Sequence, residues 1–199
     1  MNTHHQESAA PSSANDSGVE KIRIRKISWM DWRRLTELFR EIFPELTDQQ
    51  ISHYILQYED TIVVAEARKG IIGFYHFIPR HHEGTAWLNY LGVIPSCYRS
   101  GVGTQLLQDY EERAARMGFR LAEFDVLQHN QRAIGFYEKH GYTRLYPVDN
   151  KFRYRKTLAA DVRAVADSRP IRTRPYLERW GRRMLYLVLV GLSLWFASL

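Results

Sequence analysis

Two glycines, Gly101 and Gly103, stand between an apolar run that ends at Val93 and an amphipathic segment that begins near Val102. Glycine lets the backbone approach a ligand closely, and the free N–H groups at the start of a helix bind phosphate oxygens. The neighbouring side chains that could add hydrogen-bond donors are Arg99, Ser100 and Thr104. This spacing predicts a phosphate-binding turn, although the same glycines would also suit a tight turn with close helix packing.

Two motifs in the sequence carry a family resemblance. The matching positions are Val93, Pro95, Gly101 and Gly103 in the first motif, and Asn130, Ala133, Phe136, Tyr137, Gly141 and Tyr142 in the second. Together they resemble the GCN5-related N-acetyltransferase superfamily, the acyl-CoA-dependent transferases, and the resemblance covers about residues 21–157. One position departs from the family motif, because Tyr98 stands where Arg or Gln is usual and Arg99 follows one residue late.

The resemblance implies an α/β fold with a mixed central sheet, a splayed strand pair and helices on both faces. It also implies acetyl-CoA as cosubstrate, with the pyrophosphate on the glycine turn and the pantetheine arm along the backbone of Val93. The residues implied to bind the cosubstrate are Val93, Arg99, Ser100, Gly101, Val102, Gly103, Thr104 and Asn130. Asn130 would orient the loop or contact acetyl-CoA. Tyr137 would protonate the departing thiolate, with a purely structural buried aromatic as the alternative.

The stretch 121–127 alternates, which puts Glu123 and Asp125 on the same face of a strand. In N-terminal protein acetyltransferases of the superfamily, the position five residues before the motif asparagine often holds a Glu or His base. That position is Asp125 here, so we expect Asp125 to act as the base or to orient the amine; a solvated or ion-paired carboxylate is the alternative. A catalytic tyrosine of the preceding strand in many of those enzymes corresponds to Trp87, with Tyr90 nearby.

The activity that the resemblance implies is transfer of an acetyl group from acetyl-CoA to a primary amine. The amine would attack the thioester directly in a ternary complex, without an acyl-enzyme. A protein N-terminus or a lysine is the expected acceptor, and a small-molecule amine is the alternative. A membrane-tethered module that binds acyl-CoA without turnover is a further alternative.

The elements that must position these residues are predicted from hydrophobic periodicity and turn residues. We expect strands near 21–27, 61–67, 71–78, 85–93, 121–127, 142–145 and 152–157, and helices near 28–43, 47–58, 102–117 and 131–140. The order indicates an antiparallel first half and a βαβ-like second half.

The composition sets limits on the class of protein. A chain of 199 residues that is 45% hydrophobic and 25% charged is long enough for one globular domain with tails, and it excludes whole-chain disorder. The single cysteine, Cys97, excludes an intrachain disulfide. No Cys or His residues have the spacing of zinc ligands, so we expect no metal.

The positive charge is confined to the C-terminal part of the chain. Residues 1–143 hold 16 Lys or Arg and 18 Asp or Glu, a net of −2, whereas residues 144–199 hold 12 and 4, a net of +8. Basic residues followed by the uncharged apolar run 184–199 favour a membrane surface as partner over nucleic acid. As a helix this run would be roughly 24 Å long, short of the roughly 30 Å hydrocarbon core.

We therefore expect four segments: a disordered leader (1–20), the transferase domain (21–157), a basic linker (158–183) and an apolar tail (184–199). The tail would be a marginal span or a shallow anchor, or alternatively a helix buried in a homodimer. The positive flank would keep an anchored domain at the cytoplasmic face of the membrane. A cytoplasmic location is the expectation in either case.

Overall fold

The computed structural model describes residues 22–159 and contains one seven-stranded sheet. The strands are β1 (Arg23–Lys26), β2 (Ile62–Ala67), β3 (Gly70–Arg80), β4 (Thr85–Val93), β5 (Leu121–Leu127), β6 (Thr143–Val148) and β7 (Lys151–Thr157). The helices are α1 (Trp32–Ile42), α2 (Asp48–Tyr58), α3 (Val102–Arg116) and α4 (Gln131–Lys139). The strand order is β1-β2-β3-β4-β5-β7-β6, and β4 with β5 is the parallel pair. This is the mixed α/β fold that the sequence predicts.

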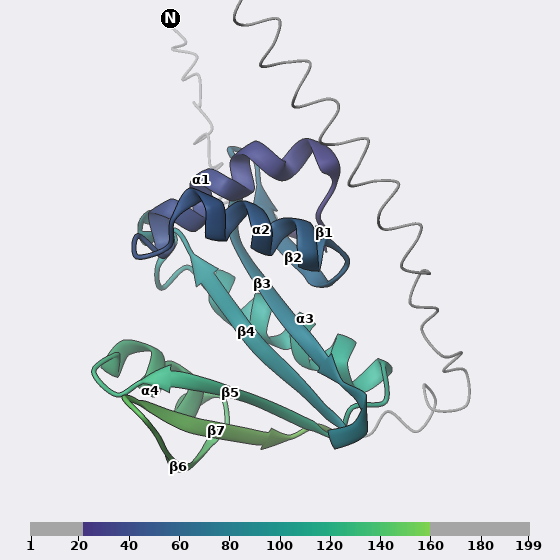
Figure 1. The fold of residues 1–199 in the computed structure, drawn as a ribbon, viewed down its shortest axis with the longest axis vertical. Coiled ribbons are helices and arrows are strands. Elements are labelled where there is room, and N and C mark those ends of the chain that lie inside the picture. The colour runs from purple at the N-terminus through teal and green to yellow at the C-terminus, as the bar shows by residue number, and fades with distance from the viewer. Residues whose placement is uncertain (1–21, 160–199) are drawn as a thin grey trace, which may run out of the picture.

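Helices cover both faces of the sheet (Figure 1). Helices α1 and α2 pack on one face through an apolar layer that includes the fully buried Leu35, Phe39 and Ile51. Helices α3 and α4 pack on the other face, where Leu106 and Tyr110 are fully buried. Each buried apolar side chain of this size stabilises the fold by about 1.5–3 kcal/mol relative to exposure.

The predicted element boundaries agree closely with the structure around the motifs. The strands expected at 85–93 and 121–127 are β4 and β5 without change. The helix expected from Ser28 begins with a short 3-10 turn, Trp29–Asp31, and becomes α-helical at Trp32. The backbone N–H of Ser28 donates to Asp31 Oδ2 at 2.6 Å, and this local contact accounts for the tight first turn.

The two central strands β4 and β5 diverge soon after they meet, which confirms the expected splayed pair (Figure 1). They pair only where Thr85–Trp87 lies beside Leu121–Glu123. Beyond that point β5 keeps its register with β7, and within residues 22–159 no strand pairs with this edge of β4.

The direction of the backbone N–H groups near the end of β4 follows from its pairing with β3. The N–H of Ile94 donates to Ile72 at 2.9 Å, toward β3. Alternate residues of a strand direct their N–H groups to opposite edges, so the N–H of Val93 points to the edge that β5 has left.

Candidate active site

The glycine turn leads from the end of β4 into the first turn of α3. Gly101 is the N-cap of α3 and has φ +84°, a left-handed conformation that favours glycine. The N–H groups that follow it belong to the first turn of a 15-residue helix, where no carbonyl of the preceding turn accepts from them. Val102 is buried in the core, so it can offer a ligand only its backbone. The turn therefore presents successive N–H donors at the positive end of a helix dipole.

The protein atoms around Gly103 leave enough space for a side chain at this position. A Cβ built at Gly103 would lie 3.6 Å from Phe136 and 3.8 Å from Val93, which are ordinary contacts. Close helix packing therefore does not require glycine at this position. The remaining physical reason for a glycine at position 103 is that it leaves the start of α3 open to a ligand.

The hydroxyls beside the turn have partners within the protein. Ser100 donates to the carbonyl of Cys97 at 2.6 Å, so its proton stabilises the turn. Thr104 Oγ1 lies 3.1 Å from His140 Nε2, and His140 Nδ1 lies 2.7 Å from the carbonyl of Phe136. Because a carbonyl only accepts, Nδ1 carries a proton and donates to Phe136, and Nε2 is the ring nitrogen that faces the Thr104 hydroxyl. His140 lies one residue before Gly141, at a position where the family motif leaves the residue type open, so the motif gives no signal for it.

Asn130 and Tyr137 are both placed by α4. Asn130 is the N-cap of that helix, and its Oδ1 accepts from the N–H of Ala133 at 3.1 Å. The side chain of Asn130 therefore contacts the backbone of the protein itself, at the start of α4. Tyr137 is 8% exposed, and its ring centroid lies 4.0 Å from that of Phe124 on β5. Burial raises the pKa of Tyr137 well above 10, so the phenol keeps its proton at neutral pH.

Asp125 lies in an ion pair, which is the alternative that the sequence leaves open beside a role as base. Its register partner on β7 is Arg153, whose guanidinium binds both carboxylate oxygens, with Nη2 to Oδ2 at 3.1 Å. The hydrogen bond to Asp125 raises the pKa of Arg153. Glu123 forms the equivalent cross-strand pair with Arg155 at 2.5 Å. Both carboxylates share one face of β5, as the alternation predicts, and arginines of β7 neutralise them.

The alternating arginines of residues 151–157 were the sequence signal for these pairs. The register between two strands that lie far apart in the chain depends on tertiary packing, so β5 alone could not identify them.

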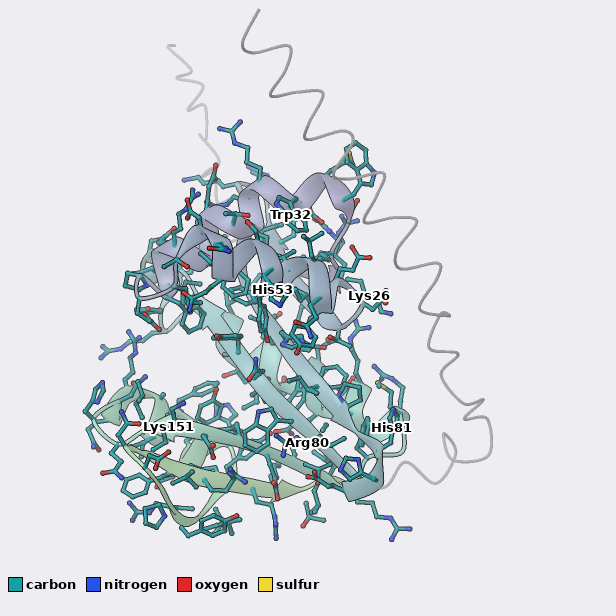
Figure 2. All side chains as sticks on the ribbon, in the orientation of Figure 1. Lys26, Trp32, His53, Arg80, His81 and Lys151 are labelled. Atoms are coloured by element: carbon teal, nitrogen blue, oxygen red, sulfur yellow. The ribbon has the colours of Figure 1, made fainter. Side chains whose placement is uncertain are left out.

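Trp87 lies beside the Asp125–Arg153 pair. The guanidinium of Arg153 is 4.5 Å from the Trp87 ring, and that of Arg80 is 4.1 Å from the same ring. Figure 2 shows Arg80 near the converging ends of the strands, while Lys151 lies at the far end of β7. Tyr90, the other aromatic of β4 near this position, packs against Phe39 of α1 instead.

A comparison with protein families decides the assignment of the chain. The sequence model of the acetyltransferase (GNAT) family matches residues 24–142. The chain belongs to this family. A search of the curated proteins found no matching relative.

Solved structures share the GNAT fold of this chain. PH1933 from Pyrococcus horikoshii OT3 has a TM-score of 0.61 at 19% identity, over 70% of this chain and 99% of its own. The PaiA N-acetyltransferase of Thermoplasma acidophilum, in complex with coenzyme A, has a TM-score of 0.57 at 22% identity, over 69% and 99%. The ribosomal-protein-S18-alanine N-acetyltransferase of Escherichia coli has a TM-score of 0.59 at 16% identity, over 70% and 95%. At these identities the likeness concerns the fold.

GNAT enzymes are acetyltransferases that use acetyl-CoA, and this chain is therefore an acetyl-CoA-dependent acetyltransferase. Two backbone features of the chain fit that cosubstrate. The unpaired edge of β4 at Val93 suits the amide groups of an extended pantetheine arm, and the N–H groups after Gly101 suit a pyrophosphate.

Within residues 22–159, no group of three or more His, Cys, Asp or Glu side chains could hold a metal ion. In the same part of the GNAT chain, no helix is long and apolar enough to cross a membrane. The predicted leader, the apolar tail and nearly all of the basic linker lie outside the described residues. The membrane and homodimer hypotheses, which depend on the tail, therefore stay predictions.

Proposed function

We propose that this enzyme acetylates the primary amine of a protein N-terminus or a lysine, by direct attack of the amine on acetyl-CoA in a ternary complex. The observation that carries the proposal is the divergence of β4 from β5 immediately before the glycine turn. It leaves the free backbone edge at Val93 continuous with the N-terminus of α3. A long thioester can lie along this path with its pyrophosphate at one end and its acetyl group between the two strands.

The proposed cosubstrate-binding residues act partly through backbone N–H groups and partly through side chains. Val93 binds the pantetheine arm through its N–H, and the backbone of Gly101, Val102 and Gly103 binds the pyrophosphate. Thr104 adds a hydroxyl whose orientation depends on His140. Arg99 adds positive charge, Ser100 holds the turn in shape through Cys97, and Asn130 holds the start of α4.

The chemical step forms one bond and breaks another. The amine nitrogen attacks the thioester carbonyl carbon, and the carbon–sulfur bond of the resulting tetrahedral intermediate then breaks. The nitrogen loses one proton to water as the amide forms. The sulfur gains one proton, donated by the Tyr137 hydroxyl, which takes its replacement from solvent. The raised pKa of Tyr137 keeps this proton in place before the sulfur departs.

For Asp125 we propose the amine-orienting role rather than that of the base. Arg153 binds Asp125 through both carboxylate oxygens, so two of the roughly four lone-pair directions of the carboxylate are occupied. Such a group can accept a hydrogen bond from the substrate amine through its remaining lone pairs and so orient it, without removing a proton. A protonated amine would then lose a first proton to water before it attacks, in addition to the proton that the nitrogen loses as the amide forms.

The preference for a protein acceptor rests on two supports. The first is the motif position of Asp125, five residues before Asn130. The second is the fold likeness to the Escherichia coli enzyme whose name specifies an alanine of ribosomal protein S18. A small-molecule amine remains the second candidate, because the net charge of −2 over residues 1–143 would tolerate any cationic acceptor. Membership of an acetyltransferase family favours catalysis over the non-catalytic acyl-CoA-binding alternative.

A thiol-release assay with acetyl-CoA separates these candidates. The acceptors are peptides with a free α-amine, matched peptides with a blocked α-amine and one lysine, doubly blocked peptides as controls, and a panel of small amines. We expect CoA release with one of the first two classes and none with the doubly blocked peptides. Release only with small amines would overturn the protein-acceptor proposal. No release with any acceptor, despite CoA binding, would overturn transfer itself.

A further inference from the structure

Three residues of α4 face the phosphate-binding turn. They are spaced by four positions, which puts them on one side of a helix: Arg132, Phe136 and His140, the last being the C-cap. Phe136 lies 3.6 Å from the position of a Cβ at Gly103, and His140 Nε2 lies 3.1 Å from Thr104 Oγ1. This side of α4 is therefore a second wall of the turn, opposite the start of α3.

Arg132 contacts the turn through Tyr98. Its guanidinium carbon lies 4.0 Å from the centroid of the Tyr98 ring, and Nη2 donates to the Tyr98 hydroxyl at 3.2 Å. Stacking on an aromatic face holds a guanidinium in place while it leaves most of its N–H donors free. Within residues 22–159 Arg132 forms no ion pair with a carboxylate, in contrast to Arg113, Arg153 and Arg155.

Tyr98 occupies the position at which the sequence departs from the family motif by lacking Arg or Gln. The turn thus has no cationic side chain at that position, although a pyrophosphate carries two negative charges. Arg132 brings a charge to the same place from another helix, because the ring of Tyr98 serves as its platform. A planar guanidinium with free donors is well matched to phosphate oxygens.

We propose that Arg132 is a cosubstrate-binding residue that contacts the pyrophosphate of acetyl-CoA, and that Tyr98 positions it. The assignment rests on the proposed function, since it requires acetyl-CoA on the glycine turn. His140, on the same side of α4, contributes to the proposed site by orienting the hydroxyl of Thr104.

The test measures CoA affinity by calorimetry for the full chain and for matched charge-removal variants. Arg132→Gln should weaken CoA binding by about tenfold, the usual effect of losing a charge-assisted hydrogen bond. Lys139→Gln removes a charge from the same helix, at an exposed residue that makes no ion pair within the described chain, and should leave the affinity within about twofold. Arg132 is exposed, so the thermal midpoint of Arg132→Gln should equal that of the wild type.

A double variant that moves the positive charge from α4 back into the glycine turn tests the assignment more sharply than Arg132→Gln by itself. Tyr98→Arg combined with Arg132→Gln should restore most of the lost affinity, because it places a guanidinium at the motif position. Dephospho-CoA, which lacks the 3′-phosphate but keeps the pyrophosphate, should show the same loss for Arg132→Gln as CoA does. A loss that disappears with dephospho-CoA would overturn the pyrophosphate contact.

The outcomes also separate this assignment from the proposed function. If the wild type and Arg132→Gln bind CoA equally well, the assignment of Arg132 is wrong and the proposed function stands. If Arg99→Gln weakens binding and Arg132→Gln does not, the positive charge comes from the turn itself and the assignment of Arg132 is again wrong. A folded wild-type protein that binds no CoA would overturn both.

Discussion

Arg153 binds Asp125 through both carboxylate oxygens from the directly opposite position on the neighbouring strand. The two side chains are 18% and 17% exposed, so the pair is largely shielded from water yet still reachable at its edge. Trp87 closes one side of the pair through the Arg153 guanidinium. This arrangement fixes the direction of the carboxylate, and fixed direction is the property that a substrate-orienting group needs.

Asp125→Asn should lower kcat/KM by about tenfold, less than the about hundredfold or more expected for loss of a general base. The factor should be the same from pH 6.5 to pH 9, because an orienting carboxylate takes no proton from the amine. Initial rates of thiol release across this range measure it. A loss that shrinks steadily as the pH rises would identify Asp125 as the base instead.

Gly103→Glu should abolish measurable CoA binding and leave the fold intact. The added carboxylate would occupy the space of the pyrophosphate, whereas a negative charge in the first turn of α3 suits the helix dipole. Gly103→Ala is the control, because its Cβ would make only ordinary contacts at 3.6 and 3.8 Å. Calorimetry and circular dichroism on both variants decide the outcome. Unchanged CoA affinity in folded Gly103→Glu would refute the phosphate-binding turn.

Tyr137→Phe should lower kcat by about tenfold or more and leave CoA affinity within about twofold, since only the proton donor is lost. The ring contacts with Phe124 and Phe136 remain, so the stability should change little. Tyr142→Phe is a suitable control, because it removes a buried hydroxyl from the same aromatic cluster. Equal rates for wild type and Tyr137→Phe would mean that another group protonates the thiolate.

His76 should make the fold sensitive to acid. It is fully buried beneath α2, where its Nδ1 contacts the hydroxyl of Tyr54, and burial lowers its pKa from 6.5 to about 3. The unfolded chain therefore binds one more proton than the folded chain between these two pH values. The cost to stability is absent above pH 6.5 and grows by up to about 1.4 kcal/mol per unit as the pH falls toward 3.

Urea unfolding at pH 7 and pH 5 tests this dependence. His76→Gln lacks the titrating group and should lose less stability between the two pH values than the wild type does. Identical losses for the two proteins would show that other groups cause the acid sensitivity.

Removal of residues 175–199 should abolish binding to anionic liposomes and preserve activity on a soluble acceptor. The reason is the sequence pattern of basic residues before an uncharged apolar run, whose burial is worth several kcal/mol at about 25 cal/mol per Å². Flotation of the full-length chain beside the truncated one measures the effect. A full-length chain that stays free of liposomes as a dimer, with a monomeric or unstable truncated form, would show that the tail mediates oligomerisation.

Local features of this protein could be predicted from the sequence because they depend on neighbours along the chain. Alternation in residues 121–127 placed Glu123 and Asp125 on one face of a strand, and the structure confirms that arrangement. The strand boundaries of β4 and β5 and the glycine at the start of α3 followed from periodicity and turn chemistry. The splayed strand pair and the roles expected of Tyr137 and Asn130 came from resemblance to a family, since no local pattern contains them.

Contacts between distant segments were decided by the tertiary structure. The register of β5 with β7 brings Arg153 to Asp125 across 28 positions of sequence, and the docking of α4 brings Arg132 to Tyr98 across 34. The same docking brings His140 to Thr104. Strand register and helix docking are set by how whole apolar faces pack, so one segment alone does not encode its partners. The sequence thus determined which groups could serve the proposed site, and the packing of β7 and α4 determined their ion-pair and hydrogen-bond partners.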